Sequence, residues 1–328
     1  MVTLEPVDKV EVHVLVDNLT DNLSSVPAFV ETELAALGRR RRGKWVLAGR
    51  CLCCAVHGLS CLVTAYRGQQ ARTILFDTGP EDRTFEQNVS RLDADLAPVE
   101  AIVLSHGHWD HGGAVLRALD LIRDRNGGRE IPYYAHPDMF RTRALKLPSG
   151  AMVPMQDVPT LDELAAHGAR VVNTTEEQAI LGDLIYVSGE IPRVTSFEQG
   201  FPEQHRRTLD GQEWEPDPLT ADERYVAVNI AGKGLVVLTA CSHAGVINVL
   251  THAKERFAGV AIHAVVGGIH LAGANEKVIP QTVDAMRAFA PAIIAAGHCT
   301  GWRAMSARAT AFGDKCLAPL AVGKRYTF

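Results

Sequence analysis

The sequence lacks the features that mark exported, membrane-spanning and disulfide-stabilised proteins. No apolar run approaches the roughly 18–20 residues that a transmembrane helix needs. The N-terminal stretch has no basic segment followed by a long apolar one, so we expect no signal peptide. The 7 cysteines are an odd number, and the three at positions 51, 53 and 54 crowd together, unlike a disulfide framework. We therefore expect a cytoplasmic protein with reduced thiols. A metal site at these three cysteines is the alternative, and it is disfavoured because the sequence has no second cysteine pair at zinc-finger spacing.

The sequence also lacks a strong excess of positive charge. Lysine and arginine number 33 against 38 aspartate and glutamate residues, which gives a net charge of −5. This balance argues against a dedicated nucleic-acid binder, and no membrane partner is expected. Hydrophobic residues make up 47% and charged residues 22%, which is typical of a globular protein. No break in composition divides the 328 residues, so we expect one domain over 1–328, whose assembly into a homo-oligomer is left open.

Short apolar runs bounded by turn residues predict strands. They are Val10–Val16, Cys61–Tyr66, Thr73–Phe76, Ala101–Leu104, Ile131–Ala135, Leu184–Val187, Tyr225–Ile230, Leu235–Thr239, Ile262–Val266 and Ala292–Ala295. Helical patterns lie at Ala114–Arg125, Leu161–His167, Val246–Phe257 and Pro280–Phe289. Strands that come early as hairpins and later alternate with helices predict an α/β fold with two sheets packed face to face and helices outside.

Two segments are predicted to be irregular. Ala36–Gly49 contains the run Arg39–Arg42 followed by Gly43 and Lys44, and Thr195–Asp222 is rich in glycine, proline and charge. Long irregular segments in a compact domain are often lids or binding loops. The arginine run is interpreted as a solvated surface loop, with attraction of an anionic substrate as the functional alternative.

One segment carries most of the chemistry. An apolar strand leads directly into His106, His108, Asp110 and His111, and two glycines follow. In a nearly extended segment residues two apart point the same way, so His106 and His108 can bind one metal ion from one side. Asp110 and His111 come where the chain turns and can face a second ion. Imidazole and carboxylate are the ligands of zinc, manganese and iron sites that activate water.

Three later histidines, His243, His270 and His298, each follow an apolar strand and a stretch of glycine or small residues. Ligands converge where strand ends meet at one edge of a sheet. A lone histidine in this setting is more often structural, but three in the same setting indicate a shared site. We expect His243 and His298 to be metal ligands and His270 to be a ligand, a supporting group or a substrate contact. The other histidines, His13, His57, His136, His167, His205, His252 and His263, lack part of this context.

The order of these residues resembles the HxHxDH signature of the metallo-β-lactamase superfamily. Asp77, in Phe76–Gly79, resembles the aspartate turn that supports the metal site in that superfamily. A closer resemblance is to a subgroup usually described as metal-dependent hydrolases. It rests on Asp17-Asn18, His57–Ser60, Leu104–His108, Tyr134–Pro137, Gly189–Arg193, Cys241–Gly245, Gly267–Leu271 and His298–Gly301, which occur in this order over most of the chain. The subgroup includes the archaeal-type synthase that joins a dihydropterin methyl diphosphate to ribofuranosylaminobenzene phosphate.

The resemblance implies a four-layered αβ/βα sandwich with metal ions in a cleft at the sheet edges. We prefer two Zn²⁺ ions per chain, with Mn²⁺ or Fe²⁺ as alternatives and a single ion left open. The sequence departs from the superfamily pattern at Gly189–Arg193, where a Thr-Pro-Gly-His ligand segment is expected, and at Cys241–His243, where the bridging aspartate is expected. The bridging ligand is therefore left open.

Three functions follow from this reading. The first is a metal-dependent hydrolase that uses a metal-activated water on a small anionic ester or phosphoester, with Asp110 and His270 in catalytic roles. Glu190, Arg193 and His270 are the expected substrate contacts. The second is a transferase of the pterin-joining kind, in which the same metal site holds a diphosphate leaving group. The third is a non-catalytic binding or sensing module, which would be expected to have lost metal ligands.

Overall fold

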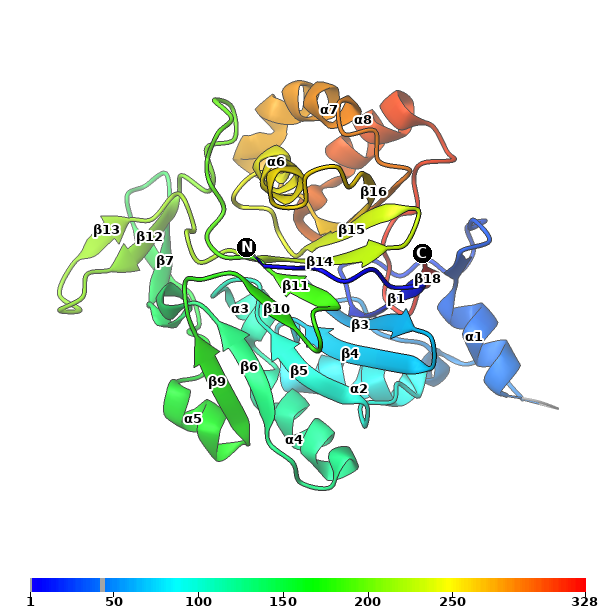
Figure 1. Cartoon of the computed structure of the whole chain (residues 1–328). Coiled ribbons are helices and arrows are strands. Elements are labelled where there is room, and N and C mark those ends of the chain that lie inside the picture. The colour runs from blue at the N-terminus through cyan, green and yellow to red at the C-terminus, as the bar shows by residue number, and fades with distance from the viewer. Residues whose placement is uncertain (1, 42–44) are drawn as a thin grey trace.

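Two β-sheets lie face to face in the computed structural model, which describes residues 2–41 and 45–328 (Figure 1). The larger sheet has the strand order β2 (Val30–Glu31), β18 (Arg325–Thr327), β1 (Lys9–Val16), β3 (Ser60–Arg67), β4 (Gln70–Phe76), β5 (Val99–Val103), β6 (Ile131–Ala135) and β9 (Ala169–Asn173). The second has the order β10 (Gln178–Ile180), β11 (Ile185–Val187), β14 (Tyr225–Ile230), β15 (Gly234–Thr239), β16 (Ile262–Gly268) and β17 (Ile293–Gly297).

Helices cover the outer face of each sheet (Figure 1). The helices in chain order are α1 (Glu33–Arg40), α2 (Asp82–Leu92), α3 (Trp109–Gly112), α4 (Val115–Asn126), α5 (Leu161–Ala166), α6 (Val246–Arg256), α7 (Ile279–Arg287) and α8 (Trp302–Phe312). Short 3-10 helices are η1 (Gly49–Cys51), η2 (Pro137–Phe140), η3 (Gly273–Val278) and η4 (His298–Thr300).

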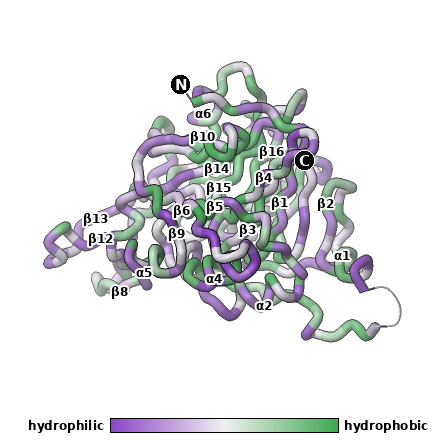
Figure 2. Tube along the Cα trace, turned by 60° about the horizontal axis from the view of Figure 1, so that its bottom comes forward, coloured by the Kyte–Doolittle hydropathy of each residue, from purple (hydrophilic) through white to green (hydrophobic). Residues whose placement is uncertain are grey.

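The buried apolar residues form three clusters that correspond to the spaces between layers. Val12 of β1 and Val228 of β14 belong to the cluster between the two sheets. Successive residues of a strand point to opposite faces of the sheet. In β4, Ile74 therefore belongs to the same cluster between the sheets, whereas Leu75 packs outward among residues of α2 and α4. Val237 packs among residues of α6 and α7 on the other side. Figure 2 shows the apolar residues concentrated along β14, β15 and β16. The predicted αβ/βα sandwich is confirmed.

Every predicted strand and helix is present, with ends shifted by at most three residues. The helices α2 and α8 were not predicted. Only four residues of α2 are buried, namely Phe85, Asn88, Val89 and Leu92, so its apolar stripe is narrow. In α8 only Ala304 and Arg308 are buried, which leaves almost no apolar periodicity in the sequence.

The prediction that Ala36–Gly49 is irregular is wrong for its first residues. These belong to α1, where the side chain of Thr32 accepts a hydrogen bond from the amide of Ala35 and so caps the helix. Arg39 pairs with Glu31, and Arg40 donates to the main-chain carbonyls of the last two residues of α2. Arg39 and Arg40 are thus bound to the protein itself, and Arg41 is exposed; Arg42, Gly43 and Lys44 lie outside the described residues.

The prediction for Thr195–Asp222 is wrong in part, because this segment contains two short strands. β12 (Gln204–Arg207) and β13 (Trp214–Pro216) join β7 (Arg143–Lys146) and β8 (Met152–Pro154) in a four-stranded antiparallel sheet. This small sheet, called the side lobe below, projects from one end of the sandwich (Figure 1). No helix in the described parts of the chain is both long and apolar enough to cross a bilayer. All seven cysteines are free.

Candidate metal centre

Parallel strands bring the predicted ligands to one edge of the sandwich. In the first sheet β4 and β5 run parallel, and the motif that begins at His106 follows the end of β5. In the second sheet β15, β16 and β17 run parallel, and they are followed by His243, His270 and His298 respectively. Since the carboxyl ends of parallel strands meet at the same edge, side chains from distant parts of the chain converge there.

The first cluster consists of His106, His108 and His243, whose candidate ligand atoms all lie within 4.8 Å of one another. All three rings are buried. The Nε2 atom of His106 lies 2.9 Å from Nδ1 of His108. Neither ring nitrogen of His243 has a hydrogen-bond partner. Buried polar atoms in native structures are rarely left without partners. The unpartnered nitrogens of this cluster therefore indicate a binding site for a cation, which accepts nitrogen lone pairs.

Hydrogen bonds behind the rings show which nitrogen of His106 carries its proton. Ser105 Oγ donates to Asp77 Oδ2 at 2.7 Å, so this hydroxyl can only accept from His106 Nδ1, which is 2.9 Å away. His106 therefore carries its proton on Nδ1 and has a lone pair on Nε2. Orientation of a ligand histidine through its second nitrogen is a regular feature of metal sites.

The side lobe fixes the second ring in the same manner. Gln204 Nε2 donates to the carbonyl and carboxylate of Asp217 and to Thr220, so Gln204 Oε1 faces His108 Nε2 as an acceptor. The proton of His108 is thus on Nε2, and its lone pair is on Nδ1. Two lone pairs, on His106 Nε2 and His108 Nδ1, face each other at 2.9 Å. Such a pair is repulsive unless a cation lies between or beside the two atoms, so the residues fit a metal ion.

The second cluster surrounds one carboxylate oxygen, Oδ2 of Asp110. It lies 3.4 Å from Nε2 of His298, 3.6 Å from Nε2 of His111 and 3.3 Å from Nε2 of His57. His111 donates from Nδ1 to Asp77 Oδ2 at 2.7 Å, so its Nε2 is the atom that faces Asp110. His298 Nε2 has no hydrogen-bond partner. The donors therefore also fit a metal ion at this second position.

The electrostatics of the two clusters differ. Burial, together with the neighbouring histidines, lowers the pKa of His106 and of His243 well below the usual range, so both rings are neutral near pH 7. Burial also lowers the pKa of His111, but Asp110 and Asp77 outweigh it and raise this pKa to about 9. Burial raises the pKa of Asp110, whereas the surrounding histidines lower it well below its usual range. Positive charge is therefore favoured beside Asp110.

Cys241 was not predicted as a site residue, yet it lies between the clusters. Its Sγ belongs to three groups of candidate ligand atoms, and in each group all the atoms lie within 4.8 Å of one another. The other members are His106 and His111 in the first group, His243 and His270 in the second, and His298 and Cys299 in the third. The distance from Sγ to His111 Nε2 is 3.4 Å. The signal was present in the sequence, because Cys241 begins the segment where the superfamily pattern expects a bridging aspartate.

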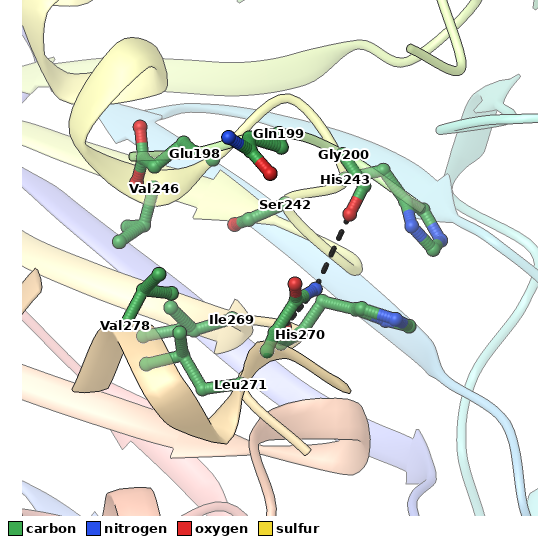
Figure 3. Close-up of a pocket in the computed structure, with 12 residues that line it drawn as sticks. Glu198, Gln199, Gly200, Ser242, His243, Val246, Ile269, His270, Leu271 and Val278 are labelled. Atoms are coloured by element: carbon green, nitrogen blue, oxygen red, sulfur yellow. Dashed lines mark hydrogen bonds between the residues drawn. The ribbon is translucent and has the colours of Figure 1, made fainter. Parts of the chain in front are cut away.

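His270 lies at the wall of a small pocket beside the first cluster. Its ring centre is 4.3 Å from that of His243, and its Nδ1 has no hydrogen-bond partner. Figure 3 shows the two rings pointing to the same side, away from Val246 and Val278. The segment that follows, Gly273–Val278, forms the 3-10 helix η3. The assignment of His270 to substrate rather than to metal stays a prediction.

The other predicted substrate contacts already have partners in the protein. Glu190 Oε1 lies 3.1 Å from Nε2 of His136, and its side chain is half exposed. The guanidinium of Arg193 donates to the main-chain carbonyls of Ile191, Leu219 and Thr220. A role in substrate binding would require these contacts to be exchanged, and it stays a prediction for both residues.

Comparison with known proteins agrees with this geometry. Residues 72–178 match the beta-lactamase superfamily domain. The chain is 26% identical over 251 residues to 7,8-dihydropterin-6-methyl-4-(beta-D-ribofuranosyl)-aminobenzene-5'-phosphate synthase of Methanocaldococcus jannaschii, covering 76% of this chain and 82% of that protein. It is 29% identical over 252 residues to an uncharacterized protein of the same organism, covering 77% of this chain and 87% of that one.

A solved structure shares the fold over almost the whole chain. The crystal structure of Tm1679, a metal-dependent hydrolase of the beta-lactamase superfamily, superimposes with a TM-score of 0.70 at 21% identity and covers 96% of this chain and 98% of that one. Residues 72–178 thus match the beta-lactamase superfamily domain, the chain has the metallo-β-lactamase fold, and it is similar over 76% of its length to the Methanocaldococcus jannaschii synthase.

Proposed function

We propose that this chain is a metal-dependent hydrolase acting on a small anionic ester or phosphoester. We further propose that it binds one or two divalent ions, with Zn²⁺ preferred over Mn²⁺ and Fe²⁺. The proposal rests on two facing lone pairs, one on His106 Nε2 and one on His108 Nδ1. The two atoms lie 2.9 Å apart, and a hydrogen bond to the other nitrogen of each ring fixes the position of its lone pair. No nucleic acid or membrane partner is proposed.

The proposed ligands fall into the two clusters. His106, His108 and His243 would hold one ion, and Asp110, His111 and His298 the other, with Cys241 between them. A divalent ion in such a site supplies Lewis-acid stabilisation of negative charge and makes water acidic enough to react near neutral pH.

The chain's own groups then orient the reactants. Asp110 is buried and its lowered pKa keeps it ionised, so its carboxylate can bind an ion or hold a nucleophile in place. His270 has an unpartnered Nδ1 at the pocket wall and can bind an oxygen of the substrate. Phe201 stacks on His243 with ring centres 5.6 Å apart and, with Gln204, covers this side of the site.

The second candidate is a transferase of the pterin-joining kind. The similarity to the archaeal synthase, at 26% identity over 76% of the chain, favours it. In this reaction the ions would hold a diphosphate leaving group, and an aromatic acceptor would take the place of water. Both candidates use the same ligands, so the geometry of the centre supports them equally.

The test begins with elemental analysis of the purified protein. It continues with a panel of phosphodiesters, lactones, thioesters, and a pterin methyl diphosphate offered with ribofuranosylaminobenzene phosphate. Release of a hydrolysis product supports the hydrolase, and a joined product supports the transferase. The double variant His106→Ala/His108→Ala serves as the control, because any turnover that survives in it does not come from this centre.

A further inference from the structure

Asn18 lies between two imidazole rings of the second cluster and contacts each with a different end of its amide. Its Oδ1 accepts from the main-chain amide of Gly58 at 3.1 Å and lies 3.1 Å from Nδ1 of His298. Its Nδ2 lies 3.1 Å from Nδ1 of His57 and donates to the carbonyl of His298 at 3.3 Å. The main-chain amide of Gly58 can only donate, so it establishes which end of Asn18 is the oxygen.

The two rings must therefore carry their protons on opposite nitrogens. The amide oxygen of Asn18 accepts from His298, so the proton of His298 is on Nδ1 and the lone pair on Nε2 faces Asp110. The amide nitrogen of Asn18 donates to His57, so the lone pair of His57 is on Nδ1. In the neutral ring the proton of His57 is then on Nε2, which points at Asp110 Oδ2 from 3.3 Å.

Distances alone would make His57 a metal ligand. With metal–ligand bonds of about 2.1 Å, the ligand atoms of a tetrahedral site lie about 3.4 Å apart. The separations of His57 and His298 from Asp110 Oδ2, 3.3 Å and 3.4 Å, both match this spacing. A nitrogen that carries a proton cannot coordinate an ion, however, and the contact with Asn18 leaves the proton of His57 on the atom that faces the site.

We propose that His57 is a hydrogen-bond donor of this centre and not a metal ligand. In the resting site its Nε2–H donates to Asp110, and with substrate bound it donates to a phosphate or carboxylate oxygen. This inference rests on the proposed function. Exposure supports it, because the side chain of His57 is 55% exposed whereas those of His111 and His298 are 0% exposed. His57 therefore stands at the mouth of the site, where an anionic substrate would arrive.

The position of the proton can be measured directly. In zinc-loaded protein with ¹⁵N-labelled histidine, long-range ¹⁵N–¹H spectra distinguish the two neutral forms of each ring, and the signals that vanish in His57→Phe assign this residue. We expect His57 with its proton on Nε2 and His298 with its proton on Nδ1. In Asn18→Asp the donor is replaced by an acceptor, so the proton of His57 should move to Nδ1. A metal-bound Nε2 in wild-type His57 would overturn the proposal.

Binding measurements test the role of the donor. His57→Phe should leave zinc stoichiometry unchanged and zinc affinity within about threefold, while inorganic phosphate should bind the zinc-loaded protein about tenfold more weakly. His57→Gln keeps an N–H donor and should recover part of the phosphate affinity. His167→Phe is the matched control, since His167 pairs with Asp120 at 2.8 Å on the surface and neither affinity should change.

The outcomes separate this inference from the proposed function. Loss of one zinc ion, or a fall in zinc affinity of more than about tenfold in His57→Phe, would make His57 a ligand and overturn the inference alone. Unchanged phosphate affinity in His57→Phe would also overturn it. If the wild-type protein binds no divalent ion, the proposed function fails and the inference fails with it. If wild-type protein binds zinc but not phosphate, the anionic substrate class and the donor role to substrate are contradicted.

Discussion

Arg143 donates from Nη1 to the main-chain carbonyl of Gly107 at 3.2 Å, at the residue between the first two histidines of the motif. Asp222 completes the contact, because its Oδ2 accepts from the amide of Gly107 at 2.8 Å and its Oδ1 pairs with Arg143 Nη2 at 2.7 Å. Both charged side chains are buried. An ion pair between Arg143 of the side lobe and Asp222, in the turn before β14, thus holds both main-chain polar groups of Gly107.

We predict that Arg143→Met destabilises the protein and weakens metal binding. The substitution leaves Asp222 charged, buried and without its main partner, which typically costs about 3–5 kcal/mol of unfolding free energy. It also frees the loop that sets the spacing of His106 and His108. Denaturant unfolding and a zinc titration measure the two effects.

Arg117→Met is the matched control for this substitution. Arg117 forms an exposed ion pair with Glu86 at 2.6 Å, and such pairs contribute about 1 kcal/mol or less. Equal losses of stability in the two variants, or unchanged zinc affinity in Arg143→Met, would contradict the role of the buried pair.

The second prediction concerns metal content. The purified protein should carry one to two equivalents of zinc, manganese or iron. The double variant His106→Ala/His108→Ala should lose at least one of them, because it removes both facing lone pairs of the first cluster. Elemental analysis after gel filtration measures the content. Full retention of metal in the double variant would show that the ions bind elsewhere.

The third prediction is that Asp110→Asn folds but loses most of its turnover. An amide cannot supply the negative charge that holds His111 and His298 around the second position, and it is a poor acceptor for a proton. Circular dichroism reports folding, and initial rates on whichever panel compound the wild type converts report activity. Survival of activity within about tenfold, roughly 1.4 kcal/mol of barrier, would remove Asp110 from the catalytic groups.

The fourth prediction separates the later histidines. His243→Ala and His298→Ala should each lower bound metal, because each contributes an unpartnered nitrogen to one cluster. His270→Ala should lower activity more than metal content. A metal-bound structure would decide between these roles: a ring nitrogen of His270 at about 2.0–2.2 Å from an ion would make it a ligand, contrary to our expectation.

The fifth prediction is that Cys241→Ser weakens binding at both positions. Burial raises the pKa of the Cys241 thiol well above its usual range, so the thiol stays protonated unless a cation binds beside it. Zinc binding to wild-type protein should then release one proton more than binding to the variant, as measured by calorimetry in buffers of different ionisation enthalpy. Cys316→Ser, in a half-buried thiol outside the groups of candidate ligands, is the control. Equal proton release would exclude Cys241 as a ligand.

The fold and the motif histidines could be predicted because each leaves a pattern along the chain. Alternation in Val10–Val16 indicates a strand with one buried face, and His106 directly after an apolar strand indicates a site at a sheet edge. The side lobe could not be predicted, since a strand such as β12, with the sequence QHRR, has no apolar periodicity. Its stability comes from pairing with β7, which lies about 60 residues earlier.

The residues that support the site could not be predicted for a related reason. Gln204, Asn18 and Cys241 act through contacts with residues far away in the chain, and only the folded arrangement brings those partners together. Cys241 had a signal in its position after β15. Gln204 is one polar residue in a segment rich in them, and no local pattern distinguishes it.

The clusters draw their donors from both sheets: His106 and Asp110 follow β5 of the first, and His243 and His298 follow β15 and β17 of the second. An ion bound by such a set would be a cross-link between the two halves of the sandwich, present only when the halves are docked. Ions that bind the native state alone add to its stability by mass action, by about 2.7 kcal/mol at a free concentration 100 times the dissociation constant. The concentration of available metal would then determine the stability of the folded chain as well as its activity.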